Sequence, residues 1–192
     1  MRIGAAWRAF PGETVCGDVM GWWREGAATL ACIADGLGHG PEAHRAARSV
    51  AAVAQECAGD PAERLRQIDR AVRHTRGAAA ILVRIDPGPM TLTVAATGNV
   101  QGALFGPRTR RFEGAAGIVG AGLRQVGSLD LPYAAADLLV LWTDGLRPVD
   151  LDESARRHRR DPDRLAALLL ARFGTEGDDC AVLCIDFADG PG

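Results

Sequence analysis

The spacing of apolar residues along the chain follows two patterns, which predict different secondary structures. Short apolar runs bounded by turn residues predict β-strands over residues 19–23, 29–34, 78–85, 91–96, 101–105, 138–143 and 180–187. Apolar residues that recur at every third or fourth position predict helices over residues 41–58, 61–74 and 163–173. The stretch 106–132 is rich in glycine and follows neither pattern, so we expect it to be irregular.

Turn residues between the predicted strands indicate antiparallel hairpins. Gly26 lies between the first two strands, and Pro87 and Gly88 lie between the third and the fourth. Hairpins joined to a pair of helices, rather than alternating βαβ units, predict an α+β fold with antiparallel sheet. No repeat, linker or change of composition divides the chain. We therefore expect a single domain over residues 1–192, with a short flexible tail after residue 187.

Four aspartates lie at the ends of predicted strands. Asp35 and Asp144 each follow an apolar strand and precede a glycine, whereas Asp18 and Asp178 each precede a strand. A hairpin of the first two strands brings Asp18 and Asp35 to one sheet edge, and antiparallel pairing of the last two strands brings Asp144 and Asp178 together. Four clustered carboxylates raise one another's pKa values, and divalent cations resolve that conflict. Oxygen ligands without Cys or His favour Mg²⁺ or Mn²⁺, and four acids suit two ions better than one.

Two other interpretations of these residues remain open at this point. An Asp-Gly pair makes a turn after a strand whatever the function of the protein. The glycine-rich segment 36–40, between a strand and a helix, is also typical of a nucleotide-binding loop, although Asp35 directly before it would repel phosphate unless a cation intervened. Such a loop needs a second strand that ends in an acid about 20 residues further on, and the nearest acid, Asp60, separates two helices instead.

The charged residues exclude several kinds of chemistry. All 22 cationic side chains are Arg, so the chain has no P-loop lysine and no lysine that forms a Schiff base. The acids are 16 Asp and only 8 Glu, and Asp is a short, rigid oxygen ligand. The formal net charge of −2 gives no electrostatic reason to expect nucleic acid or an anionic membrane as a partner. If the protein handles phosphate, metal ions would supply the positive charge that no lysine can.

Signals for export or membrane insertion are missing from the printed sequence. The first residues include no long apolar run, and no stretch approaches about 18 apolar residues. The five cysteines are odd in number and lack Cys-x-x-Cys spacing, so we expect them to be buried as small apolar side chains in a reducing compartment. These features predict a cytoplasmic protein.

The ordered acidic motifs resemble those of a known family. The segments that carry the resemblance are Gly17-Asp18, Ala34-Asp35-Gly36-Leu37-Gly38-His39-Gly40, Thr143-Asp144-Gly145 and Gly177-Asp178-Asp179. Together they resemble the SpoIIE-like branch of the metal-dependent serine/threonine phosphatases, the PPM or type 2C superfamily, and most of all its small stand-alone RsbX-type members. The resemblance spans about residues 12 to 187.

The resemblance implies a fold and a metal site. The family fold is a four-layer sandwich of two antiparallel β-sheets flanked by helices. In such a site Asp35 would bridge two Mn²⁺ or Mg²⁺ ions. Asp144 and Asp178 would complete the ligands of the first ion, and Asp18 and the Gly36 carbonyl would hold the second.

The resemblance also implies an activity and a partner. A water shared by the ions would hydrolyse phosphoserine or phosphothreonine on a STAS-type regulator or a stressosome scaffold, as part of partner switching. His39 is the candidate general acid, two places later than the histidine of type 2C enzymes. Neutral Asn99 replaces the acid that would hold a third ion, and Arg8 is the only candidate for the phosphate-binding arginine of larger relatives. The alternative hypothesis is a silent pseudophosphatase that binds a phosphoprotein.

Overall fold

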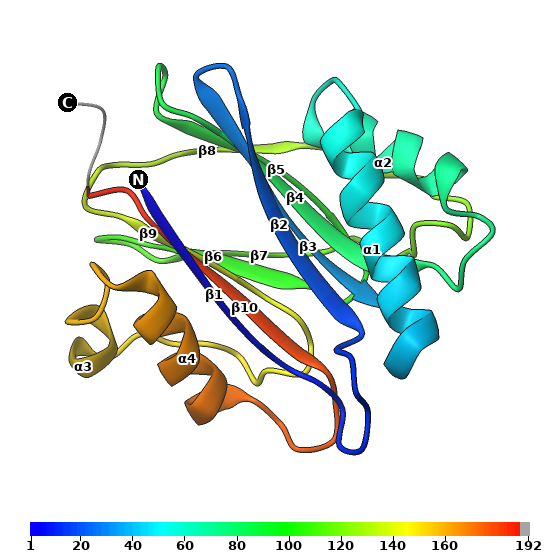
Figure 1. The fold of residues 1–192 in the computed structure, drawn as a ribbon. Helices are drawn as coiled ribbons and strands as arrows, with labels where there is room; N and C mark the ends of the chain where they lie inside the picture. Colours follow the sequence, from blue (N-terminus) through cyan, green and yellow to red (C-terminus); the bar gives the residue numbers. More distant parts are fainter. Residues whose placement is uncertain (189–192) are drawn as a thin grey trace.

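Two antiparallel sheets form the centre of the computed structural model, which describes residues 1–188 (Figure 1). The predicted tail after residue 187 lies almost entirely outside the described residues. Sheet A has the strand order β1 (Arg2–Arg8), β10 (Cys180–Asp186), β9 (Leu138–Trp142), β6 (Gln101–Phe105) and β7 (Arg110–Glu113). Sheet B has the order β2 (Asp18–Glu25), β3 (Ala28–Gly36), β4 (Ala78–Asp86), β5 (Thr91–Thr97) and β8 (Leu129–Pro132).

Helices cover the outer face of each sheet. Figure 1 shows α1 (Gly40–Glu56) and α2 (Pro61–Ala71) beside sheet B, and α3 (Glu153–Arg156) and α4 (Pro162–Phe173) beside sheet A. These four layers confirm the predicted α+β sandwich. None of the helices in residues 1–188 is long and apolar enough to cross a membrane.

The central strands are apolar throughout because both of their faces are buried. Along β3, Ile33 contributes to the core between the two sheets, whereas its neighbour Cys32 contributes to the core under α1 and α2. Along β9, Leu141 faces the core between the sheets and Val140 faces the core under α4. Adjacent side chains of a strand point to opposite faces, so a strand in the middle of four layers needs an apolar residue at every position.

The strand pairs that the sequence predicts are present in the predicted orientation. β2 pairs antiparallel with β3, and Asp18 lies opposite Asp35. β9 pairs antiparallel with β10 from Leu138 opposite Asp186 to Trp142 opposite Val182. β4 and β5 form the second predicted hairpin. The rule that brings acids at strand ends to one sheet edge therefore applies.

Three edge or short strands were not predicted. β1 contains poor strand-forming residues such as Gly4, and its apolar and polar residues do not alternate. Trp7, near its end, is apolar but 63% exposed. It forms because it pairs with β10 along its whole length. β7 and β8 lie in the segment predicted to be irregular, and each is a four-residue strand paired on one side only. Short edge strands depend on their neighbours more than on local pattern.

Candidate metal centre

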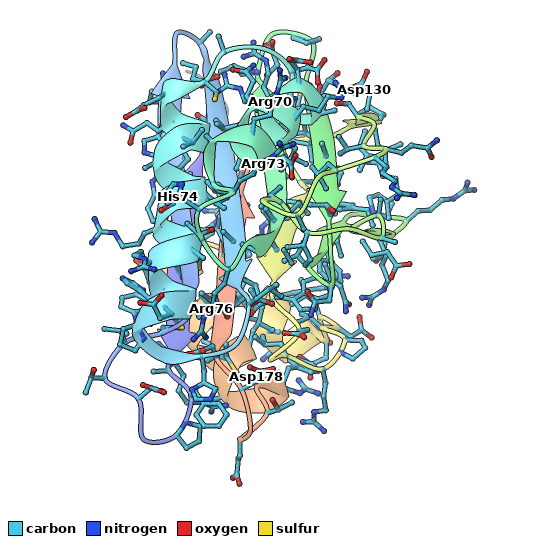
Figure 2. The ribbon with its side chains drawn as sticks, turned by 90° about the vertical axis from the view of Figure 1, so that its right-hand side faces the viewer. Arg70, Arg73, His74, Arg76, Asp130 and Asp178 are labelled. Atoms are coloured by element: carbon cyan, nitrogen blue, oxygen red, sulfur yellow. The ribbon has the colours of Figure 1, made fainter. Side chains whose placement is uncertain are left out.

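The structure brings the four predicted acids together at one end of the two sheets. In sheet B, Asp18 begins β2 and lies opposite Asp35 on β3. In sheet A, Asp144 lies just after β9 and Asp178 lies just before β10. Figure 2 labels Asp178 at this end of the molecule. The carboxyl group of Asp35 interacts electrostatically with the other three. Each sheet therefore contributes two acids to a single cluster, as the hairpin geometry predicts.

The negative charges of the cluster are not balanced by nearby positive charge. Burial, followed by the negative charges of Asp18 and Asp144, raises the pKa of Asp35 to about 9. Burial also raises the pKa of Asp18 to about 7, although a hydrogen bond from Thr143 acts in the opposite direction. The pKa of Asp178 is raised as well, mainly by burial and then by Asp144. The apo cluster therefore retains protons near neutral pH that exposed aspartates lose, and a divalent cation would replace them.

A fifth acid, Asp179, belongs to the same region and was not predicted as a site residue. Its side chain is buried, and its Oδ1 atom accepts a hydrogen bond of 2.9 Å from the Phe10 amide. Its Oδ2 atom is buried and has no hydrogen-bond partner among the described residues. It also adds to the rise in the pKa of Asp18. The only sequence signal was its position directly after Asp178, in the segment before β10.

The chemistry of these side chains fits hard divalent cations. The donors are carboxylate oxygens, the ligands that Mg²⁺ and Mn²⁺ prefer. Within residues 1–188, no three His, Cys, Asp or Glu side chains already converge as the ligands of one ion would. Mg²⁺ usually keeps several waters and takes only one or two carboxylates, so a divided set of acids is compatible with two such ions.

Thr143 fixes one acid across the gap between the sheets. Its hydroxyl donates a hydrogen bond of 2.7 Å to Asp18 Oδ2 and accepts one of 2.9 Å from the Ala181 amide. Thr143 is completely buried, so this hydroxyl has no competing contact with water. The side chain of Asp18 is thereby held by a residue of the opposite sheet.

The glycines after the acids allow close packing. A Cβ atom on Gly36 would lie 2.0 Å from the Ala43 carbonyl oxygen of α1, and one on Gly145 would lie 1.9 Å from the Asp179 carbonyl oxygen. Gly36 is the last residue of β3, so the Asp35-Gly36 pair is part of a strand and not a turn. The interpretation of this pair as a simple turn signal is therefore wrong.

His39 lies beside the cluster and is held on two sides. Its Nδ1 atom is 2.6 Å from Glu13 Oε1, and its ring stacks on Phe10 with 4.2 Å between centroids and 13° between planes. Burial and Asp144 raise the pKa of Asp178, and the positive charge of a protonated His39 opposes that rise slightly. Glu13 precedes His39 by 26 positions, and nothing in the sequence indicated this contact.

Two residues singled out by the resemblance have specific contacts. The Asn99 side-chain amide donates a hydrogen bond to Asp144 Oδ2. Asn99 therefore lies at the cluster as a neutral hydrogen-bond donor. The Arg8 guanidinium donates to the Thr175 carbonyl and to Cys180 Sγ, so its described contacts are to this loop and strand and not to the acids.

The raised pKa values predict a pH-dependent effect of metal on stability. The pKa of Asp35 is higher in the folded protein, about 9, than the ordinary value of 3.8. Its contribution to stability is thus complete below the ordinary value and is lost as the pH rises toward the folded value. We expect the Tm of chelated protein to fall between about pH 5.5 and about pH 8.5, and Mg²⁺ or Mn²⁺ to raise Tm more at the higher pH. Thermal unfolding at both pH values, with and without metal, measures this. An equal or larger metal effect at the lower pH would contradict it.

Comparisons with known proteins agree with the fold and the acidic motifs. A family model described as Stage II sporulation protein E (SpoIIE) matches residues 25–188. Phosphoserine phosphatase RsbX of Bacillus subtilis (strain 168) is 23% identical over 143 residues, which cover 73% of this chain and 72% of that protein.

Solved structures share the architecture. A chain from a structure described as the bacterial stressosome, a modular system adapted to control secondary messenger signalling, aligns with a TM-score of 0.88 at 27% identity, covering 95% of this chain and 97% of that chain. RsbX in complex with magnesium aligns with a TM-score of 0.79 at 20% identity, covering 94% and 92%. The catalytic domain of PstP with two manganese ions aligns with a TM-score of 0.70 at 17% identity, covering 96% and 97%. The chain therefore belongs to the SpoIIE-like branch of the PPM, or type 2C, phosphatases.

Proposed function

We propose that this protein is a phosphatase that hydrolyses phosphoserine or phosphothreonine on a protein, with two Mn²⁺ or Mg²⁺ ions at the acid cluster. Asp35 would bridge the ions. Asp144 and Asp178 would complete the ligands of one ion, and Asp18 and the Gly36 carbonyl would hold the other. The observation that carries this proposal is the cluster of four carboxylates from both sheets, in which burial and neighbouring acids raise the pKa values of Asp18, Asp35 and Asp178.

The protein's own residues have distinct parts in this reaction. Two bound ions would supply an activated water and positive charge for the phosphoryl oxygens. The Thr143 hydroxyl keeps the Asp18 carboxylate oriented. Because Glu13 occupies Nδ1 of His39, the Nε2 atom is left to donate a proton to the departing serine oxygen. His39 would thus act as the general acid.

The substrate that we propose is a phosphorylated regulator of the STAS type or a stressosome scaffold. The support is the similarity to RsbX, a phosphoserine phosphatase, and to a chain of a stressosome structure. We further propose that residues 1–192 act as one domain in the cytoplasm. The five cysteines are free in the structure, and four of them are buried, which suits a reducing compartment.

Two alternatives predict different behaviour. A pseudophosphatase would bind a phosphoprotein without turnover, but the four acids that would hold metal are all present. A nucleotide-binding protein would use the glycine loop between β3 and α1 and would bind nucleotide without metal. Titration with Mn²⁺ together with an assay of turnover tests the first alternative, and equilibrium dialysis with nucleotide in chelator tests the second.

The decisive experiment is hydrolysis of a phosphoserine peptide. We expect release of inorganic phosphate with Mn²⁺ or Mg²⁺ and none after chelation, and activity that returns when metal is added back. Activity that survives complete chelation would overturn the metal-dependent mechanism. Metal binding without any turnover on phosphoserine or phosphothreonine peptides would favour the pseudophosphatase.

A further inference from the structure

One face of the molecule, beside the acid cluster, carries a concentration of exposed cationic side chains. They come from α2, from the turn that follows it, and from the glycine-rich loop between β7 and β8. We call this the basic face and define it by Arg66, Arg70, Arg73, His74, Arg76 and Arg124. Figure 2 shows Arg70, Arg73, His74 and Arg76 one below another, toward the end of the molecule where Asp178 lies. Asp130, also labelled there, lies at the opposite end.

The negative charges near this face are too few to neutralise it. Arg66 and Arg70 share the carboxylate of Glu63, at 3.1 and 3.9 Å. Arg73 is 3.7 Å from Asp69 in a second, loose pair. Among the described residues, Arg76 and Arg124 have no ion pair at all. Asp60, at the start of α2, also interacts with Arg66. Five guanidinium groups thus face three carboxylates, on a chain whose net charge is −2. This local excess of positive charge is available to a partner.

The loop is attached to α2, so the face has a defined shape. The amides of Gly120 and Gly122 both donate hydrogen bonds of 2.9 Å to Asp69 Oδ1. Arg66 Nη2 donates one of 2.8 Å to the Val126 carbonyl. Between the two elements is a hollow of about 400 Å³, lined by Arg66, Ala115, Arg124, Gln125, Val126 and Gly127. Its size and its two arginines suit acidic side chains.

Arg76 links the basic face to the acid cluster. Its turn is fixed, because Thr75 Oγ1 donates to the Val72 carbonyl at 2.7 Å and accepts from the Gly77 amide at 3.1 Å. The Gly77 carbonyl accepts a hydrogen bond of 3.1 Å from Leu37, in the loop that follows Asp35. A Cβ atom on Gly38 would lie 3.1 Å from Arg76 Nη1. The guanidinium therefore lies against the loop that borders the proposed phosphate site.

The conspicuous arginine run at residues 156–160 does not offer a comparable surface. Arg159 donates to Asp186 and to the Ala136 carbonyl, at 3.1 and 2.7 Å. Arg156 donates to the Leu151 carbonyl, and Arg157 pairs with Glu153 at 3.3 Å. The contact with Asp186 fastens the segment after α3 to sheet A, whereas the contacts of Arg156 and Arg157 lie within the α3 segment itself. The run that stands out in the sequence is largely structural, whereas the basic face is assembled from separated positions.

We propose that the basic face docks an acidic segment that flanks the phosphoserine or phosphothreonine of the protein substrate. This inference rests on the proposed phosphatase function and adds a substrate preference to it. Complementary charge would speed encounter and align the phosphorylated side chain with the acid cluster. A peptide suits the face better than a uniformly charged polyanion such as nucleic acid, because Glu63 and Asp69 lie among the cations. The row of cations also ends beside the acid cluster, where the phosphorylated side chain of a peptide would bind.

The test compares three substrates at fixed ionic strength. They are a phosphoserine peptide with Asp and Glu flanks, the same peptide with neutral flanks, and para-nitrophenyl phosphate, which cannot reach the basic face. We expect Arg73→Glu and Arg124→Glu each to lower kcat/KM for the acidic peptide by about 10-fold or more, mainly through KM. The values for the neutral peptide and for para-nitrophenyl phosphate should stay within about twofold of wild type. The matched control is Arg157→Glu, whose side chain is 75% exposed on the other side of the molecule.

Several results would overturn the docking proposal. These are equal use of the acidic and neutral peptides by the wild type, or the same loss in Arg157→Glu as in Arg73→Glu. If no substrate is hydrolysed, the phosphatase proposal fails and docking is measured directly, by fluorescence anisotropy of the labelled acidic phosphopeptide. Unchanged affinity in both variants, or displacement of the peptide by duplex DNA or phosphatidylserine vesicles at lower concentrations than by unlabelled peptide, would then reject it.

Discussion

Asp35→Asn should lower kcat/KM for a phosphoserine peptide by about 10³-fold or more, because the loss of the ligand that we propose to be shared by two ions would remove several kcal/mol of transition-state stabilisation. Asparagine keeps the size of the side chain but cannot carry the negative charge that a bridging ligand needs. The same substitution removes a partly buried acid that neighbouring acids repel when no metal is bound. We therefore expect the Tm of chelated Asp35→Asn protein to equal or exceed that of the wild type at about pH 8.

The combination of lost activity and retained stability separates a site defect from misfolding. Steady-state kinetics in Mn²⁺, calorimetric titration with Mn²⁺ and thermal unfolding in chelator measure the three properties. Asp150→Asn is the matched control, because its side chain is 81% exposed and should tolerate the change. An Asp35→Asn protein that keeps a tenth or more of the wild-type activity would contradict the bridging role of Asp35.

His39→Gln should lower kcat for a phosphoserine peptide by about 10²-fold, the usual contribution of a general acid. Serine is a poor leaving group and needs a proton, whereas para-nitrophenolate leaves without one. The loss on para-nitrophenyl phosphate should therefore be much smaller. Glu13→Gln should lower kcat for both substrates in the same pattern but to a smaller extent, because it weakens the orientation of His39 without removing the imidazole ring.

The difference between leaving groups is the informative result. A purely structural role for His39 would lower the activity on both phosphate esters to the same extent. Manganese affinity should remain near the wild-type value in both variants, since neither residue is among the proposed ligands. His158→Gln, on the far side of the molecule near α3, is the control. Equal losses on the two esters would remove the general-acid assignment while leaving the metal-dependent mechanism intact.

The sequence predicted the position of the acids because their neighbours determine it locally. Asp18 and Asp35 flank a short hairpin, and the register of a hairpin follows from its turn and from side chains that alternate between the two faces. The apolar runs before Asp144 and after Asp178 identified buried strands for a similar reason. The antiparallel pairing of β9 with β10 was then expected, because two apolar strands are buried together when they pair in one sheet.

Contacts between distant segments were not predictable. Thr143 reaches Asp18 across the two sheets, and Glu13 reaches His39 from the loop before β2. Neither contact follows from spacing, because each depends on how layers pack and not on the period of a strand or helix. β1 was missed because its stability comes from pairing with β10, whose residues lie at the other end of the described chain.

The position of β10 between β1 and β9 affects the order in which the protein can be completed. In sheet B, the pairs β2–β3 and β4–β5 are hairpins that form over short turns, and β3 pairs with β4 once α1 and α2 have been made. In sheet A, Arg2 pairs with Asp186, so β1 has no partner strand until nearly the whole described chain has been synthesised. Asp178 enters the acid cluster only at that moment. A nascent or truncated chain without β10 would hold the sheet B acids but would lack the complete acid cluster.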